Sequence, residues 1–371
     1  MELKRTHSVL QAGIDDETQV GAQLAVSFGG ELSELALGIA APGVAMRADT
    51  MMIWFSMSKA TCAVAVAQQW ERGSLRLDEP AATYLPEFAA NGKASITLRH
   101  LLTHTAGIPW ADGLFRSWPW RESEAENIAR ICAAPVEQDW RIGEDAGYHP
   151  GSGMAILAAV VAAVDGREYS RYVREMIFEP LGMNDCWIGL PEERFATYGD
   201  RIGVMHNTKV SPPEPLRLDQ AHFAKKVIAG GNGRGPMRDL VRLYEMLVNE
   251  GTREGVQILR PVTVAAISAK HRTDVYDRTF GAVLNWGLGF GVDGYAMGRH
   301  CSRRAFGHGG MESSAGFCDP EHRLAVAVVC NGMPGGERHH PRMDAIATAI
   351  YEDLGLSQGE GRDHNYPSAG I

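Results

Sequence analysis

The chain has 371 residues, of which 45% are hydrophobic and 22% are charged, a composition typical of a globular protein with a substantial core. Its net charge of -9 argues against nucleic acid or an anionic membrane as a partner. The longest uninterrupted apolar run, residues 154–164, is too short to cross a bilayer. No apolar segment follows the basic residues at the start, so we expect no signal peptide and a cytoplasmic location.

The predicted elements begin with a β-hairpin. Two apolar runs between residues 20 and 39 flank Gly29-Gly30, a pair suited to a tight turn. A helix that is apolar on every side then starts near residue 56 and ends near Gly73, and such a helix is normally buried.

From about residue 81 to residue 284 the pattern changes to helices joined by long loops. One of these loops is aromatic and could form a pocket wall or lid, although ordinary packing explains it at least as well; its tryptophans are Trp110, Trp118 and Trp120. Strand-like segments return from residue 286, and an amphipathic helix over residues 343–354 closes the pattern.

Strands at both ends with helices between them predict an α/β (α+β) fold in one domain, residues 1–371. We expect an antiparallel sheet flanked by helices, formed by residues of about 1–80 and 285–356. A helical lobe over residues of about 81–284 is inserted, and the functional cleft is expected between the lobes, where ligand sites tend to occur. The polar end, residues 357–371, is expected to be frayed.

The six cysteines are scattered and include no C-x-x-C pair: Cys62, Cys132, Cys186, Cys301, Cys318 and Cys330. This distribution favours free thiols in the core over a disulfide framework or a zinc site. We therefore expect neither a metal nor a cofactor.

Ser56 and Lys59 form a Ser-x-x-Lys sequence at the start of the apolar helix. Residues three apart share one helix face, so the two side chains are within reach of each other. The hydroxyl would lie at the positive end of the helix dipole, where a developing anion is favoured. The tetrapeptide alone is common, and by itself it is better explained as a helix cap or a chance match.

A second segment that could reach the cleft contains Tyr148, immediately before a predicted helix. A phenol held near Lys59 would find its phenolate form favoured by the neighbouring cation. Without the other segments, a tyrosine that packs a loop onto a helix is the better explanation.

The third segment is His308-Gly309-Gly310, followed by Met311. The glycines let a strand edge approach an acyl group closely. The amide N–H of Met311 could then donate a hydrogen bond to an oxyanion.

These segments together resemble the serine β-lactamase and penicillin-binding-protein superfamily, on the class C side that includes family VIII carboxylesterases and related acyltransferases. Residues 55–59, Phe-Ser-Met-Ser-Lys, match the first family motif. Residues 75–86 resemble the usual L-x-L-D-x-P-x-x-x-Y-L-P, and residues 96–107 resemble I-T-x-R-H-L-L-T-H-T-S-G. Residues 230–240 resemble the Gly-rich loop and helix of the helical lobe. The similarity covers roughly residues 20–355 and implies the β-lactamase-like fold.

The resemblance also implies roles for particular residues. Ser56 is the nucleophile that becomes acylated, Lys59 is its proton partner, and Tyr148 is the general base. The third motif, usually Lys-Thr-Gly, is represented by His308, Gly309 and Gly310. The amide N–H groups of Ser56 and Met311 would form the oxyanion hole.

Two positions depart from the β-lactamase pattern. Pro150 stands where the Tyr-x-Asn motif has asparagine, so no side-chain amide can bind a substrate amide. His308 replaces the lysine that is associated with anchoring a β-lactam carboxylate; it can donate a hydrogen bond but is mostly neutral at pH 7. Both changes are closer to esterase-like and acyltransferase-like relatives than to dedicated β-lactamases.

The leading hypothesis is a serine hydrolase that acts through an acyl-enzyme on a small-molecule ester. The alternative is an acyltransferase that passes the acyl group to an amine or alcohol acceptor in a biosynthetic pathway. A β-lactamase and a catalytically silent binding protein are less favoured. The expected partners are therefore an ester or acyl donor and, for the transferase, an acceptor; no nucleic acid or membrane is expected, and the sequence does not indicate an oligomeric state.

Overall fold

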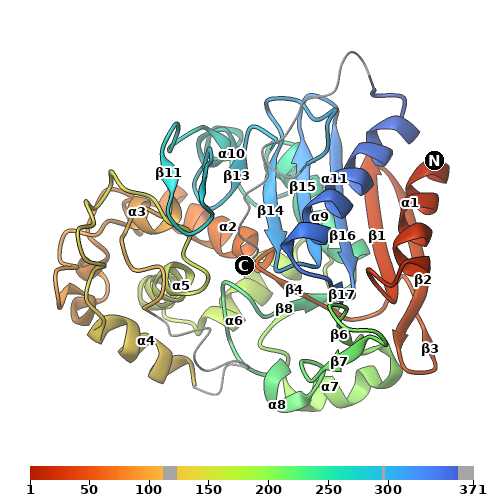
Figure 1. Cartoon of the computed structure of the whole chain (residues 1–371). Coiled ribbons are helices and arrows are strands. Elements are labelled where there is room, and N and C mark those ends of the chain that lie inside the picture. Colours follow the sequence, from red (N-terminus) through yellow and green to blue (C-terminus); the bar gives the residue numbers. More distant parts are fainter. Residues whose placement is uncertain (112–122, 295–296, 358–371) are drawn as a thin grey trace.

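A seven-stranded antiparallel sheet forms the largest layer of the structure, a computed structural model that describes residues 1–111, 123–294 and 297–357 (Figure 1). The strand order is β13-β14-β15-β16-β1-β2-β3, and each strand pairs antiparallel with its neighbours. This confirms the predicted fold class, and β1 pairs with β16 from the other end of the chain. The strands are β1 (Gly21–Phe28), β2 (Glu31–Ala41), β3 (Val44–Ala45), β13 (Gly291–Val292), β14 (Phe306–Gly310), β15 (Ser314–Asp319) and β16 (Leu324–Cys330).

The predicted hairpin is present as β1 and β2, joined at Gly29-Gly30 with positive φ at both glycines. Alternate residues of a strand face opposite sides of a sheet, and both sides of β1 are buried. The sheet therefore needs a cover on each face.

Helices supply both covers. On one face α11 (Gly336–Asp353) lies in front of the strands in Figure 1, with α1 (Lys4–Asp15) packed beside it. On the other face α9 (Met237–Val248) packs against β1, β15 and β16. The closing helix was predicted, but it begins earlier than expected, and α1 was not predicted at all.

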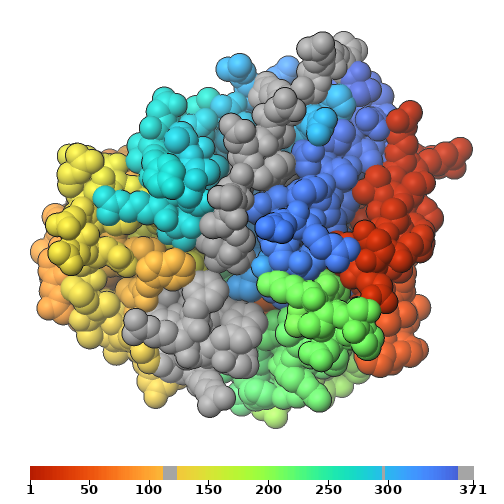
Figure 2. All heavy atoms as spheres, in the orientation of Figure 1, coloured from red at the N-terminus to blue at the C-terminus, as the bar shows by residue number. Residues whose placement is uncertain are grey.

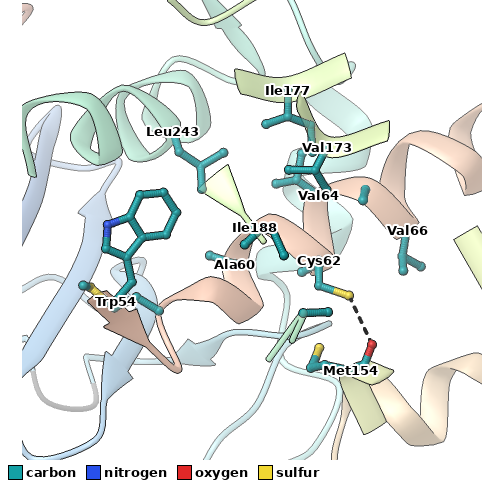
Figure 3. Close-up of a cluster of buried hydrophobic side chains, with 14 of the residues drawn as sticks. Trp54, Ala60, Cys62, Val64, Val66, Met154, Val173, Ile177, Ile188 and Leu243 are labelled. Carbon is teal, nitrogen blue, oxygen red and sulfur yellow. Dashed lines mark hydrogen bonds between the residues drawn. The ribbon is translucent and has the colours of Figure 1, made fainter. Parts of the chain in front are cut away.

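The second part of the molecule is organised around α2 (Ser58–Glu71). As its composition predicted, residues 58–69 are all buried. Figure 3 shows Val64 and Cys62 of this helix among Ile177, Ile188 and Met154, and the Cys62 thiol lies 3.9 Å from the Met154 carbonyl oxygen. The neighbouring helices are α3 (Leu98–Leu102), α4 (Glu124–Ala133), α5 (Ser152–Asp165) and α6 (Tyr169–Val173), which continues as a π-helical turn, Arg174–Phe178.

The remaining elements are short. Three strands form a sheet beside α2: β4 (Met52–Phe55), β8 (Gly233–Gly235) and β5 (Trp187–Ile188). Another three-stranded sheet contains β17 (Gly332–Met333), β6 (Met205–Asn207) and β7 (Glu214–Leu216). Two strand pairs are β9 (Thr252–Arg253) with β10 (Val256–Gln257), and β11 (Tyr276–Asp277) with β12 (Ala282–Val283). The other helices are α7 (Glu192–Tyr198), α8 (Ala221–Ala224), α10 (Pro261–Ser268) and the 3-10 turns Ala81–Thr83, Pro86–Ala89 and Gly199–Arg201.

The two parts of the chain lie side by side. In the space-filling view of Figure 2, the red and blue ends of the chain gather on one side, and the orange and yellow residues of the predicted helical lobe lie on the other. Helix α9 falls inside the predicted range of that lobe, yet it covers the main sheet. Residues 81–284 are therefore not a purely helical insertion.

All six cysteines are buried and free, as predicted. Among the helices that the structure describes, none is both long and apolar enough to span a bilayer. The predictions about Trp118, Trp120 and the end of the chain concern residues 112–122 and 358–371, which lie outside the described residues.

Candidate active site

Ser56 lies in the turn between β4 and α2. The residue before it, Phe55, has a φ of 48°, which is unusual for a bulky side chain. Ser58 fixes this turn because its hydroxyl donates to the Phe55 carbonyl at 2.6 Å and accepts the Gly233 N–H at 2.8 Å. The half-buried Ser56 is thus presented on a strained turn that β8 holds in place, the kind of strain that clusters at functional sites.

Lys59 is fully buried and has three acceptors within hydrogen-bond distance. Its Nζ lies 2.9 Å from Ser56 Oγ, 2.6 Å from the Pro150 carbonyl oxygen and 2.9 Å from the Gly230 carbonyl oxygen. An ammonium carries three donors, and each of these oxygens can accept one of them. The structure therefore brings Ser56 and Lys59 together as their spacing predicted, and it ties both to the loops before α5 and β8.

Tyr148 lies beside this pair, in the loop that leads to α5. Its side chain is 3% exposed, and the centroid of its ring is 4.9 Å from Lys59 Nζ. Four other rings surround it, with centroids between 4.7 and 6.1 Å from its own; they belong to Phe280, His104, His308 and Trp286. The predicted base is thus buried against the predicted proton partner.

The end of β14 forms the next wall. The Ser314 hydroxyl donates to the Trp54 carbonyl at 3.2 Å, which holds the β14–β15 turn against the end of β4. A Cβ on Gly310 would collide with that carbonyl and with the Ser314 hydroxyl, whereas a Cβ on Gly309 would have its nearest neighbour 3.7 Å away. The close approach of β14 to β4 therefore requires glycine at position 310. It also brings the next residue, Met311, near the segment that contains Ser56.

The His308 ring at the end of β14 donates a hydrogen bond within its own strand. Its Nδ1 lies 2.6 Å from the Gly309 carbonyl oxygen, which can only accept, so Nδ1 carries the proton and donates. Burial, together with the charge of Lys59, lowers the pKa of His308 to about 3, so the ring is neutral at pH 7, as predicted. Its Nε2 is then an acceptor, buried and without a hydrogen-bond partner among the described residues. The one N–H of His308 is therefore already used by the Gly309 carbonyl oxygen, and the ring offers an acceptor to a substrate.

Two further buried histidines support the Tyr148 loop. The Nε2 atom of the His149 ring accepts the backbone N–H of Ile108 at 3.1 Å. The backbone N–H of His149 donates to His104 Nδ1 at 3.2 Å. Burial, with the nearby charges of Arg272 and Lys59, lowers the pKa of His149 to about 3. These side chains therefore fix the loop rather than carry charge.

Sequence reasoning missed the residues that contact Tyr148 from the segment around β11 and β12. Asp277 accepts the Tyr148 N–H at 3.0 Å, and Phe280 and Trp286 pack on its ring. The only signal in the sequence is Asp277-Arg278-Thr279, a spacing typical of a turn in which an aspartate binds nearby backbone N–H groups. Within the described part of the chain, no group of three or more His, Cys, Asp or Glu side chains is arranged to hold a metal.

Comparison with known proteins identifies the family. A family model described as Beta-lactamase matches residues 7–350 of the chain. The chain belongs to the β-lactamase family. This β-lactamase-family protein is 28% identical to Esterase EstB of Burkholderia gladioli. The alignment has 408 positions, gaps included, and covers 94% of each chain. It is 26% identical to Esterase/beta-lactamase LipL of Mycobacterium tuberculosis, over 76% of this chain and 70% of that protein.

Solved structures agree with this assignment. The β-lactamase-family chain superposes on a penicillin-binding protein homologue from Caulobacter crescentus with a TM-score of 0.79 and 26% identity, covering 95% of this chain and 97% of the other. It superposes on a family VIII carboxylesterase with a TM-score of 0.77 and 26% identity, covering 93% and 96% of the two chains. The fold predicted from the sequence motifs is therefore confirmed over nearly the whole chain.

Proposed function

We propose that the protein is a serine hydrolase that cleaves small-molecule esters through an acyl-enzyme on Ser56. The observation that carries this proposal is the 2.9 Å contact between Ser56 Oγ and the Nζ of the fully buried Lys59. A serine hydroxyl is a weak nucleophile until a neighbouring group takes its proton. Tyr148 in its phenolate form is such a group, and the Lys59 ammonium, with Nζ 4.9 Å from the centroid of the tyrosine ring, favours that form.

In the first half of the reaction, Ser56 Oγ adds to the ester carbonyl carbon and its proton passes to the Tyr148–Lys59 pair. The carbonyl oxygen becomes an oxyanion, which the amide N–H groups of Ser56 and Met311 stabilise. The tetrahedral intermediate then expels the alcohol, which leaves with the proton. In the second half, water loses a proton to the same pair and attacks the acyl carbon. The bond to Ser56 Oγ then breaks, the pair returns the proton to Oγ, and the acid is released.

The side chains around Ser56 favour an ester over a β-lactam as the substrate. His308 is neutral and offers an acceptor, which is unsuited to a ligand carboxylate. Pro150 directs its carbonyl oxygen to Lys59 and has no amide for a substrate. The names of two relatives, an esterase of Burkholderia gladioli and a family VIII carboxylesterase, support the same substrate class.

The acyltransferase alternative differs only in the molecule that attacks the acyl-enzyme. An amine or alcohol in place of water would receive the acyl group, and the residues in the first half of the reaction would be unchanged. Product analysis separates the two: hydrolysis gives only free acid whatever acceptor is added, and transfer gives an amide or a new ester.

The test of the proposal is turnover of p-nitrophenyl esters by the wild type and by S56A. Release of p-nitrophenol by the wild type and its loss in S56A are expected, together with loss of fluorophosphonate labelling. Turnover by S56A at the wild-type rate would reject Ser56 as the nucleophile. A wild type that neither turns over esters nor accepts the label would favour a silent binding protein.

A further inference from the structure

The backbone of Tyr148 is held at two points by a segment more than a hundred residues away in the sequence. Asp277 Oδ1 accepts the Tyr148 N–H at 3.0 Å, and the Thr279 hydroxyl donates to the Tyr148 carbonyl at 3.0 Å. A third bond, from the Arg278 N–H to the Ala146 carbonyl at 2.8 Å, extends the contact. The main chain at Tyr148 is thus fixed on both sides of its Cα.

One carboxylate oxygen organises this contact. Asp277 Oδ1 also accepts the N–H groups of Thr279 and Phe280, each at 3.0 Å. Three backbone donors on one ionised oxygen form a strong acceptor site. The Phe280 ring, positioned by the same turn, lies 4.7 Å from the Tyr148 ring, so both the backbone and the side chain of the tyrosine depend on Asp277.

The second carboxylate oxygen faces a buried cation. Arg272 Nη2 lies 3.1 Å from Asp277 Oδ2, and the two side chains are 3% and 0% exposed. The contact is an ion pair by distance, although its N–H is not aligned for a hydrogen bond. Arg272 also donates to the Thr103 carbonyl at 3.1 Å, and its Cζ lies 5.4 Å from the Trp286 ring.

The charges around the phenol therefore come from several elements. Lys59 of α2 contacts the ring, and Arg272 lies behind Trp286, whose ring is 6.1 Å from that of Tyr148. The other titratable neighbours, His104 and His308, are kept neutral by burial, which lowers the pKa of each. Asp277 is the anion that balances Arg272 in this group.

We infer that Asp277 and Arg272 are positioning residues, which hold Tyr148 against Lys59 and balance the charge around its phenol. This inference rests on the proposed role of Tyr148 as the base. Neither Asp277 nor Arg272 is proposed to contact the substrate. Loss of Asp277 should displace the phenol and also leave Arg272 as an uncompensated buried charge.

The first experiment compares D277A, D277N and the double variant D277N/R272Q in p-nitrophenyl ester turnover. D277A should lower kcat by about 10²-fold with little change in KM, because a displaced catalytic group affects the transition state more than substrate binding. D277N should lose less, since its amide oxygen can still accept the three N–H groups. The double variant D277N/R272Q should recover much of the kcat that D277N loses, because it leaves no unpaired buried charge. Wild-type kcat in D277A, or no recovery in the double variant, would overturn the inference.

The second experiment follows the pH dependence of kcat/KM. In D277N the uncompensated Arg272 should favour the phenolate of Tyr148 and move the acid limb of the profile to lower pH. In D277N/R272Q the acid limb should return to its wild-type position. The matched control is D319N, because Asp319 is also a buried carboxylate that binds backbone N–H groups, at Ser302 and Glu321. D319N should lower the thermal midpoint without moving the limb. If D277N lowers kcat/KM at every pH but leaves the acid limb where it is in the wild type, the inference is contradicted.

The variant Y148F separates this inference from the proposed function. If Y148F turns over esters at the wild-type rate, the proposed base is wrong and Asp277 has no tyrosine to position. If Y148F is impaired while D277A and D277N behave as the wild type, the proposed function stands and only the inference fails.

Discussion

The carbonyl oxygen of Pro150 accepts a hydrogen bond of 2.6 Å from Lys59 Nζ. At this position the β-lactamase pattern has an asparagine, whose side chain the proline lacks. Two main-chain carbonyl oxygens, that of Pro150 and that of Gly230 at 2.9 Å, therefore hold the ammonium beside Ser56. This arrangement explains how a site with the altered second motif retains its lysine.

Replacing Lys59 by methionine should remove the proton partner with little change in shape. We expect K59M to lower kcat for p-nitrophenyl esters by about 10²–10⁴-fold, the range for lost acid–base catalysis. P150A is the matched control, because alanine keeps the carbonyl that Lys59 binds, and it should retain most of the turnover. Equal losses in K59M and P150A would contradict this account of the lysine.

Removing the hydroxyl of Tyr148 should impair proton transfer. Y148F is expected to lower kcat by about 10²–10⁴-fold while its thermal unfolding stays close to that of the wild type, since the ring still packs. The control is Y244F, because Tyr244 is another buried tyrosine. Unlike the proposed base, it lies away from Lys59, and its hydroxyl has no hydrogen-bond partner within the described ranges. Steady-state kinetics should show normal turnover for Y244F; normal turnover for Y148F would remove the tyrosine from the mechanism.

Two neighbouring glycines should respond differently to alanine. G310A places a Cβ against the Trp54 carbonyl and the Ser314 hydroxyl, so it should lower the free energy of unfolding by about 1–3 kcal/mol, as overpacking does, and reduce ester turnover. G309A meets its nearest atom, the Ser314 carbonyl oxygen, at 3.7 Å and should unfold like the wild type. Urea denaturation of both variants checks this, and equal stabilities would show that β14 can shift away from β4.

The buried His308 should make the protein less stable in acid. Burial and the charge of Lys59 lower its pKa to about 3, so the unfolded chain binds a proton at a higher pH than the folded chain does. Its contribution to stability is complete above the unfolded pKa of about 6.5 and is lost as the pH falls toward the folded pKa.

The variant H308Q tests this linkage, because glutamine does not titrate. Between about pH 6 and pH 4, the free energy of unfolding of the wild type should fall more steeply than that of H308Q, by about 1.4 kcal/mol per pH unit. Urea denaturation at several pH values measures both slopes. Parallel slopes would mean that His308 titrates normally in the folded protein.

The sequence was sufficient to predict the local parts of the site. Ser56 and Lys59 are three residues apart at a helix start, so their contact follows from helix geometry. The Gly29-Gly30 hairpin and the buried α2 follow in the same way from turn chemistry and apolar patterning. The assignment of Tyr148 and His308 to this site depended on the family resemblance, because nothing in their local sequence indicates which distant residues they contact.

Other features depend on tertiary structure and could not be predicted. Asp277 binds the Tyr148 N–H across 129 positions of sequence, and its local pattern predicts only a turn. Helix α9 reads as one more amphipathic helix among several, so its place on the main sheet was missed. The tautomer of His308 is set by the Gly309 carbonyl oxygen, a contact that becomes visible only when the strand end is folded.

The most direct test of the account is the mass of the protein during turnover of a slowly hydrolysed ester. The acyl-enzyme should add the mass of the acyl group alone, and peptide mapping should locate it on Ser56, with no addition in S56A. An acyl group on another residue, or turnover of the slow ester by the wild type with no acyl group on Ser56 after acid quenching at saturating substrate, would contradict the proposed mechanism.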